Sequence, residues 1–429
     1  MRDTIFAPTN GTGRLSVVTR VAGALALALY CAIAAPAEPI KIAFLGSLSG
    51  PFALQGEETL KNLQAAADLV NVRGGALDGR KFEIVAFDNK GNPQESLVVL
   101  KQAIDRDIRI VISGVSNVAH ALSDALEKHN QRNPDQTTVF LDYGALDPAL
   151  TEAKCSFWHF RFESHADMQV GVLTDYIAKL PAVKKVYLIN QDYAYGHAVS
   201  RVSAELLAKK RPDIEIVANE LIPLGKVKDF APYVAKIRAS GADSVMTGNW
   251  GNDLSLLIKA GNEAGLNVNF YTLLAAFFGT PSAIGPSGVD RVKAVYAWNI
   301  NAADPGWEKL LLESKAKYRG LTNMDYLPVY RVMEMLAAAM KKAGSENVLK
   351  VAYALEGLEY AGPSGHSWMR AEDHQMIAPI YVLGLSKSGA PGVKHDAEGN
   401  GQGWKIEALI AARDSVPPVR CKMQRPPAQ

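Results

Sequence analysis

The turn at residues 114–117, Gly-Val-Ser-Asn, has the residue types that bind an anion. It lies between an apolar, β-branched run at residues 108–112 and a segment with helical spacing that begins near Asn117. The first N–H groups of a helix have no intrahelical partner and carry the positive end of the helix dipole, so they favour a carboxylate. The Ser116 hydroxyl adds a further donor. Ser and Asn are also preferred helix caps, so an ordinary capping role is an alternative.

The sequence contains none of the motifs that would supply catalytic chemistry. The nucleophile motif G-x-S-x-G is absent, as are H-E-x-x-H, C-x-x-C, G-x-x-x-x-G-K-[ST] and a strand-linked G-x-G-x-x-G. The eight histidines have no metal-ligand spacing, and His120 and His129 lie nine residues apart on one predicted helix. This absence weakens the case for an enzyme without excluding one, and we expect no catalytic residues, cofactor or metal ion. A secreted hydrolase is the alternative.

Composition limits the class of partner. The chain has 429 residues with 48% hydrophobic and 21% charged residues, which is ordinary globular composition and allows two or three domains. The formal net charge is only +2, and Lys and Arg are scattered among acids. A nucleic-acid partner is therefore not expected.

The first 37 residues have the layout of a secretory signal peptide. Three arginines precede the apolar run at residues 21–34, and Ala35-Pro36-Ala37 supplies small residues for cleavage before Glu38. The run is shorter than the ~20 residues that span a bilayer, which argues against an anchor. We expect a mature periplasmic protein that begins near Glu38.

Two cysteines, Cys155 and Cys421, remain after the signal peptide is removed. Unpaired thiols are uncommon in an oxidising compartment, so we expect the two to form a disulfide that ties the C-terminal tail to the body. Two buried free thiols are the alternative.

The elements that would position these residues alternate between short apolar runs and helical segments, the pattern of a parallel α/β sheet. A first βαβαβ unit has strands at 40–45, 81–88 and 108–112, with helices at 56–71 and from Pro93. The same alternation of strands and helices begins again after residue 185 and predicts a second doubly wound lobe. The predicted strands are at 186–190, 214–218, 244–247, 270–272 and 292–297. The predicted helices are at 196–211, 230–240, 251–264, 307–318 and 328–342.

Several segments, taken in order, resemble the periplasmic leucine/isoleucine/valine-binding proteins, the type I solute-binding receptors of ABC importers. The resemblance covers nearly all of the mature chain. Its segments are residues 42–51 (IAFLGSLSGP), Gly56, Gly74-Gly75 with Gly79, residues 187–196 (YLINQDYAYG), 239–243 (ASGAD) and 264–266 (AGL).

The resemblance implies two lobes joined by three crossovers, with a ligand in the cleft and delivery to a permease in the inner membrane. We expect lobe 1 at residues 38–163 plus 298–365, lobe 2 at 164–297 plus 366–429, and a monomer. The carboxyl ends of strands in open α/β sheets are where ligands collect, which favours the same location.

The resemblance also assigns residues to the cleft. Ser116 and a second turn, Gly144-Ala145-Leu146, would hold the ligand carboxylate. Tyr195 matches an aromatic residue that covers the ligand amino group, and Trp250 matches another across the cleft. Both aromatics could instead be ordinary core residues.

The sequence departs from the family pattern at two of these positions. Leu146 stands where the amino-acid binders usually carry threonine, and Leu274 stands where an acid would pair with the ligand ammonium. A buried ammonium without a partner is costly, so either the ligand lacks an amino group or another acid serves. Asp325 is the proposed replacement, with an exposed helix cap as its alternative role.

These departures favour an aromatic or branched organic acid over a hydrophobic amino acid. Phe52, Trp250 and Phe277 would suit its apolar body. A bilobed sensor is a further alternative, which would require a separate signalling partner because the chain carries no signalling segment.

Overall fold

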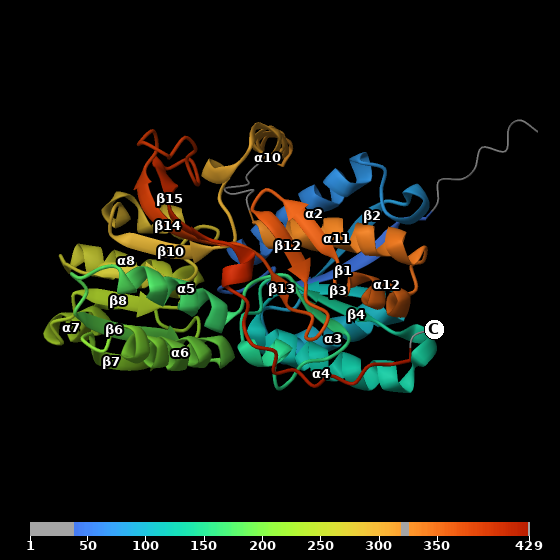
Figure 1. The fold of residues 1–429 in the computed structure, drawn as a ribbon, viewed down its shortest axis with the longest axis horizontal. Helices are drawn as coiled ribbons and strands as arrows, with labels where there is room; N and C mark the ends of the chain where they lie inside the picture. The colour runs from blue at the N-terminus through green and yellow to red at the C-terminus, as the bar shows by residue number, and fades with distance from the viewer. Residues whose placement is uncertain (1–37, 319–325, 428–429) are drawn as a thin grey trace, which may run out of the picture. The chain divides into compact units, whose positions relative to one another are not determined.

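The computed structural model describes residues 38–318 and 326–427, which form two α/β lobes side by side (Figure 1). The predicted signal peptide, residues 1–37, and Asp325 lie outside the described residues. The predicted fold class is confirmed: two doubly wound lobes are joined by three crossovers of the chain. The first is at residues 162–165, the second lies between residues 296 and 327, and the third is at residues 378–379.

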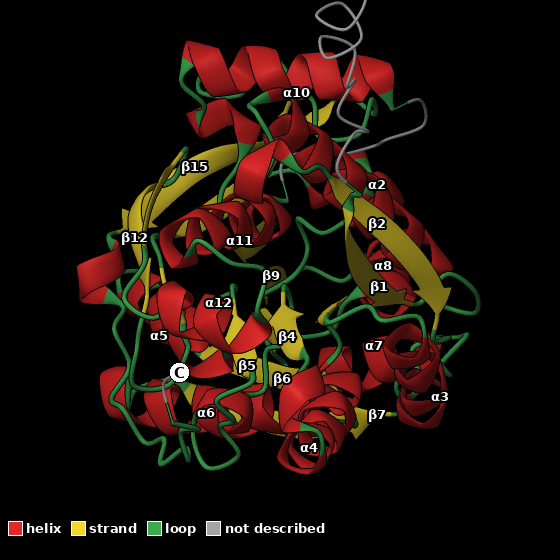
Figure 2. Cartoon of the chain, turned by 90° about the vertical axis from the view of Figure 1, so that its right-hand side faces the viewer, coloured by secondary structure: helices red, strands yellow, loops and turns green. Residues whose placement is uncertain are grey.

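The first lobe is built on a five-stranded parallel sheet with the order β2-β1-β3-β4-β5. Its strands are β1 (Ile40–Gly46), β2 (Phe82–Asp88), β3 (Ile110–Ser113), β4 (Val139–Asp142) and β5 (His159–Arg161). One face is covered by α3 (Pro93–Asp105) and α4 (Ser116–Arg132), and the other by α2 (Ala53–Val72), α11 (Leu327–Ala343) and α12 (Val348–Leu355) (Figure 2).

The side chains of β1 point alternately to the two faces of the sheet, which shows why helices cover both faces. Ala43 and Leu45 pack with α3 and α4, whereas Ile42 and Phe44 pack with α2 and α11. Successive side chains of a strand point to opposite faces, so an uninterrupted apolar run requires helices on both. The apolar stripe of α11 is also buried, namely Val329, Val332, Met333, Leu336 and Met340.

The second lobe has a seven-stranded sheet with the order β15-β14-β10-β9-β8-β6-β7. Five strands are parallel: β6 (Lys185–Gln191), β7 (Glu215–Ile222), β8 (Ser244–Thr247), β9 (Asn269–Thr272) and β10 (Val292–Tyr296). The helices are α5 (Ala166–Ala178) and α6 (Ala194–Lys210) on one face and α7 (Ala231–Ala239) and α8 (Gly251–Glu263) on the other.

An antiparallel edge distinguishes this sheet from the purely parallel one that the sequence predicted. β14 (Ile380–Lys387) pairs antiparallel with β10 and with β15 (Gln402–Ile410). β14 and β15 are consecutive strands joined by a loop without a crossover helix, so they run antiparallel to each other.

Smaller elements complete the fold. They are α9 (Thr280–Ile284), α10 (Pro305–Lys317) and a three-stranded sheet of β11 (Glu359–Gly362), β12 (Gly365–Met369) and β13 (Met376–Ile377).

The C-terminal tail leaves β15 and returns to the first lobe (Figure 1). Cys421 forms a disulfide with Cys155, with a Cα–Cα distance of 5.7 Å. Arg425 forms an ion pair with Glu356. The expected boundary, which assigned residues 366–429 wholly to lobe 2, is therefore wrong for the tail, because its contacts are with lobe 1.

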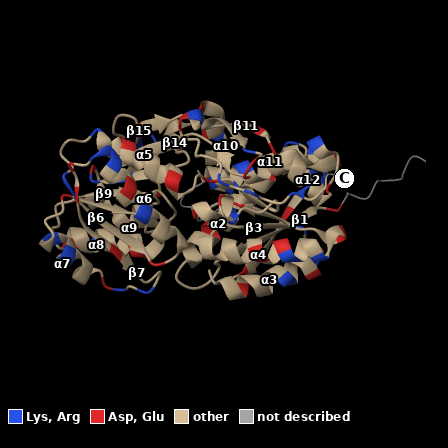
Figure 3. Ribbon diagram, turned by 60° about the horizontal axis from the view of Figure 1, so that its bottom comes forward, with Lys and Arg blue, Asp and Glu red and all other residues tan. Residues whose placement is uncertain are grey.

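Charged residues of both signs are interspersed on the two lobes (Figure 3). Within the described part of the chain, no helix is long and apolar enough to cross a membrane.

Candidate ligand-binding cleft

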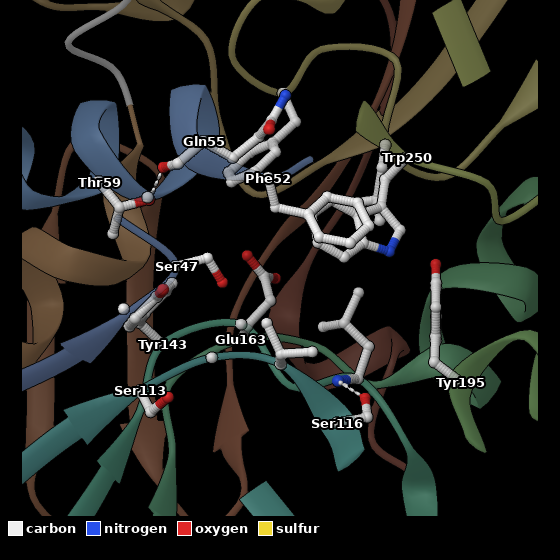
Figure 4. Close-up of a pocket in the computed structure, with 18 of the residues that line it drawn as sticks. Ser47, Phe52, Gln55, Thr59, Ser113, Ser116, Tyr143, Glu163, Tyr195 and Trp250 are labelled. Atoms are coloured by element: carbon white, nitrogen blue, oxygen red, sulfur yellow. Dashed lines mark hydrogen bonds between the residues drawn. The ribbon is translucent and has the colours of Figure 1, made fainter. Parts of the chain in front are cut away.

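A cavity of about 60 Å³ lies where the carboxyl ends of the strands of both sheets meet (Figure 4). Parallel strands end at the same edge of a sheet, so the loops that follow them converge there. On the first lobe these loops contribute Ser47, Asn89, Ser113, Ser116, Tyr143 and Glu163, and on the second they contribute Tyr193, Tyr195, Trp250, Leu274, Phe277 and Tyr296.

Ser116 is the first residue of α4, and it does not cap the helix. Its Oγ accepts hydrogen bonds from the backbone N–H groups of Leu146 (3.1 Å) and Asp147 (3.2 Å). The hydroxyl therefore keeps its own hydrogen to donate. The first intrahelical bond joins Ala119 N to Val115 O at 2.8 Å, so the N–H groups of the preceding turn have no intrahelical partner.

The second turn, Gly144-Ala145-Leu146, uses its own N–H groups inside the protein. Those of Gly144 and Ala145 donate to Asp142 Oδ1 at 2.9 and 2.7 Å, and that of Leu146 donates to Ser116. Gly144 and Leu146 line the cavity. The three N–H groups of the turn already have acceptors within the protein, so in this arrangement they are not available to bind a ligand carboxylate.

A buried arginine holds this second turn in place. Arg161, at the end of β5, donates to the carbonyl oxygen of Asp147 at 2.6 Å and to Gln375 Oε1 at 2.7 Å. Gln375 directly precedes β13, after which the chain makes its third crossover. Arg161 therefore links the second turn by hydrogen bonds to the segment that leads into this crossover.

The second lobe presents an aromatic and apolar wall. Trp250 Nε1 donates to the Tyr193 hydroxyl at 2.8 Å, and the Tyr195 ring lies edge-on to Tyr193 with centroids 5.9 Å apart. Leu274 and Phe277 extend the same wall.

Phe52 brings the two lobes into contact at the rim of the cavity. Its ring stacks on Trp250 with centroids 4.2 Å apart (Figure 4). Gly225 and Gly251 make room for it, since a Cβ at Gly225 would lie 3.1 Å from the Phe52 ring. Gln55 adds a second link by donating to Phe278 O at 3.3 Å.

Three polar atoms of the lining are buried without a hydrogen-bond partner among the described residues. They are Gln55 Oε1, Gln169 Oε1 and the Tyr195 hydroxyl. Buried polar groups are nearly always satisfied, so these atoms are positions at which a bound ligand would supply the partner. Gln55 and Gln169 were not predicted from the sequence.

Glu163 is the one ionisable acid or base, apart from tyrosines, among the described residues that line the cavity. Its side chain reaches into the cavity between Ser47 and Phe52 (Figure 4). Burial raises its pKa from 4.5 to about 7, against the lowering effects of Arg331 and of the Ser164 N–H, which donates to Glu163 Oε1 at 2.7 Å.

The sequence left open whether another acid serves in place of Leu274, and the lining does contain one, at a position that was not predicted. Leu274 does occupy the lining, but Glu163 supplies a carboxyl from the first crossover. The sequence did not indicate this residue because β5 is only three residues long and was not predicted. Its position two residues after a strand end is the signal that would have identified it.

The remaining predicted residues divide into two groups. Those in the lining are Phe52, Ser116, Gly144, Leu146, Tyr195, Trp250, Leu274 and Phe277. Asn117 and Ala145 are outside it, and Asp325 lies outside the described residues. No group of three or more metal-ligating side chains occurs in the parts of the chain that the structure covers.

A profile of the periplasmic binding protein family matches residues 39–390. The chain belongs to this family. Leu/Ile/Val-binding protein homolog 4 of Brucella abortus is 31% identical, over 94% of this chain and 96% of its own length. The leucine-, isoleucine-, valine-, threonine- and alanine-binding protein of Pseudomonas aeruginosa is 24% identical, over 83% and 91%.

Solved structures of the family have the same fold. A leucine-, isoleucine-, valine-, threonine- and alanine-binding protein from Brucella ovis, in a closed conformation, has a TM-score of 0.80 with 30% identity, and the alignment covers 91% of this chain and 100% of that one. A solute-binding protein from Rhodopseudomonas palustris BisB5 in complex with 3,4-dihydroxybenzoic acid has a TM-score of 0.75 with 17% identity, covering 87% and 98%.

Membership of this family fixes the general role. The protein is a periplasmic solute-binding component of an ABC importer, which implies a small-molecule ligand and a permease partner. The family is not enzymatic, so the secreted hydrolase considered from the sequence is set aside.

Proposed function

We propose that the protein captures a small carboxylate with an apolar body by closing its two lobes, and passes it to the permease of an ABC importer. The observation that carries this proposal is the position of the α4 N-terminus opposite an aromatic wall. The Ser116 hydroxyl and the unpaired N–H groups of the first turn suit an anion, and Trp250 and Phe277 suit an apolar group.

The size and polarity of the cavity support a small, partly apolar solute. It is enclosed between the lobes and lined by aromatic rings, with a few polar groups at defined positions. Such a lining fixes a ligand by directed hydrogen bonds at one end and by apolar contact at the other.

The contacts across the cleft support capture by closure. The stack of Phe52 on Trp250 and the bond from Gln55 to Phe278 both join one lobe to the other beside the cavity. A ligand that contacts both lobes shifts the population toward the closed form by its differential affinity.

The names of relatives indicate which solutes to test. The relative from Pseudomonas aeruginosa is named for the binding of leucine, isoleucine, valine, threonine and alanine. The Rhodopseudomonas palustris protein with the same fold was solved with 3,4-dihydroxybenzoic acid. Hydrophobic amino acids and aromatic acids are accordingly the two classes that we propose for comparison.

A thermal-shift screen tests the proposal. We expect hydrophobic amino acids, branched or aromatic keto acids, or benzoates to raise the melting temperature, because a ligand of the native state at a hundredfold excess over its dissociation constant stabilises by about 2.7 kcal/mol. Neutral amides of the same acids are the matched controls and should have little effect. A screen in which amides and acids act alike would contradict the carboxylate assignment.

We also propose that residues 1–37 are removed on export and that the mature protein is a monomer. The basic, apolar and small-residue regions of this segment support cleavage near Glu38. Intact-mass measurement of periplasmic protein should give a chain that begins near Glu38 without free thiols. An uncleaved N-terminus, or two thiols alkylated without reductant, would contradict it.

A further inference from the structure

The cleft contains a carboxyl group that its anion-binding end does not need. Glu163 follows β5 on the first crossover and is only 6% exposed. Among the described contacts, its carboxyl group accepts one hydrogen bond, from the neighbouring Ser164 N–H at 2.7 Å. Burying a carboxyl in an aromatic cavity costs free energy unless a partner compensates for it.

The surrounding charged groups do not supply that partner. Arg331 on α11, Arg161 on β5 and Asp142 on β4 act on Glu163 through their charges. The described ion pairs within 4.0 Å include none between Glu163 and a basic side chain. Arg331 instead donates to Ser364 Oγ at 2.8 Å, and Arg161 bonds to Gln375 and to carbonyl groups.

We propose that Glu163 pairs with an ammonium group of the ligand, so that the cleft selects an α-amino acid over the matching keto acid. This proposal rests on the proposed function, since it concerns the other substituent of a carboxylate held at α4. It locates ammonium recognition on the crossover between the lobes rather than at Leu274 on the second lobe.

Neighbouring acceptors support a group with several N–H donors. An ammonium carries three N–H donors and no acceptor. Besides Glu163, the lining contains Gln55 Oε1 and Gln169 Oε1, which are buried and have no partner among the described residues. A keto acid would offer these oxygens no donor, and it has no ammonium to offset the charge of its carboxylate near the ionised Glu163.

Ligand choice should therefore depend on pH. Burial raises the Glu163 pKa to about 7, and the groups that face it are Arg331, Arg161 and Asp142, with the hydroxyls of Tyr195 and Tyr326. An ammonium favours the ionised form, so amino-acid affinity is full above pH 7 and falls below it as Glu163 takes up a proton. Keto-acid affinity changes in the opposite direction.

Calorimetry with five probes tests the proposal at pH 8. The probes are leucine with 4-methyl-2-oxopentanoate, phenylalanine with phenylpyruvate, and benzoate. We expect the wild type to favour each amino acid over its keto acid. Glu163→Gln should weaken amino-acid binding by roughly ten- to a hundredfold, the usual loss for a charged hydrogen bond, and leave keto-acid binding unchanged or tighter.

Two further variants separate specificity from structure. Glu163→Asp keeps the charge and should keep a preference for amino acids. Glu334→Gln removes a partly buried acid, one bonded to Tyr360 and Arg73 away from the cavity, and should leave the ratio of affinities unchanged. A merely structural role for Glu163 would move both classes of ligand together.

The outcomes distinguish this inference from the proposed function. If keto acids or benzoate bind and the amino acids do not bind more tightly, the inference is overturned and the proposed function stands. An equal loss of both classes in Glu163→Gln would also overturn it. If none of the five binds to folded protein, the proposed function falls as well.

Discussion

The two walls of the cleft differ in chemistry although they come from lobes of the same architecture. The first lobe contributes a group of small polar side chains beside the rings of Phe52, Tyr143 and Tyr326; the group is Ser47, Thr59, Asn89, Ser113 and Ser116. The second contributes Tyr193, Tyr195, Trp250, Leu274 and Phe277. The comparison suggests that the first wall recognises the head of a ligand and the second its body.

The aromatic residues of the cleft occupy positions where helices usually carry a polar cap. The N-cap residues of α2, α6 and α8 are Phe52, Tyr193 and Trp250, and none makes a side-chain capping bond. By contrast, the N-cap residues of α3 and α10 are Asn92 and Asp304, whose side chains accept hydrogen bonds from the first N–H groups of the helix. A lost cap costs about 1 kcal/mol, so the cleft gives up some stability for its binding surface.

The most severe test of the second wall is Trp250→Ala. This change removes both a cavity-lining ring and the partner of Phe52, so we expect binding to weaken by about 2 to 4 kcal/mol, as for a buried aromatic residue at the centre of a binding surface. The loss should be greater for phenylalanine than for alanine. Calorimetry checks it, with Trp250→Phe as the milder control. Equal losses for both ligands would argue against body recognition by this wall.

Glu163 lies between the two walls, and its burial has a consequence for stability. The pKa is raised from 4.5 to about 7, so its contribution to stability is full below about pH 4.5 and is lost as pH rises through 7. At pH 8, Glu163→Gln should therefore raise the free energy of unfolding of the ligand-free protein by up to roughly 3 kcal/mol relative to wild type. At pH 4 the same change should have almost no effect.

Thermal unfolding of both proteins at the two pH values measures this difference. Glu334→Gln serves as a control for loss of an acid away from the cavity. A stabilisation by Glu163→Gln that is the same at pH 4 and pH 8 would show that the buried charge of Glu163 is not its cause.

Ser116→Ala tests the first wall. It removes a donor to the ligand and also the acceptor for the N–H groups of Leu146 and Asp147. We expect binding to weaken by about 1 to 3 kcal/mol for every carboxylate, independent of the body attached to it, with the fold intact. Calorimetry and circular dichroism check the two parts. An unchanged dissociation constant would exclude Ser116 from the site.

Phe52→Leu should have the smallest effect of the series. It keeps an apolar contact with the second lobe but removes the stack on Trp250, which is worth about 0.5 to 1.5 kcal/mol. Small-angle scattering at subsaturating ligand should show a lower closed fraction. Val72→Ala, an exposed position on α2, is the control. No change in the closed fraction would mean that the stack does not contribute to closure.

The sequence by itself determined the two doubly wound lobes and much of the site. Apolar periodicity is a local property, and it predicted β8 (Ser244–Thr247) to the residue and α11 to within one residue at each end. Ser116 was indicated by its turn after a predicted strand, whose end determines where the loop lies, and Trp250 was indicated by the family resemblance. Both line the cavity.

Only the tertiary structure decided what lies between the lobes. Glu163 lines the cavity because the first crossover runs beside it. Arg161 bonds to Gln375, which is 214 positions away in the sequence. The C-terminal tail returns to the first lobe, where Cys421 pairs with Cys155. These contacts join segments that are far apart in sequence, and no local pattern encodes them. The partner of a buried charge depends on how whole elements pack, and a sequence contains that information only through its fold.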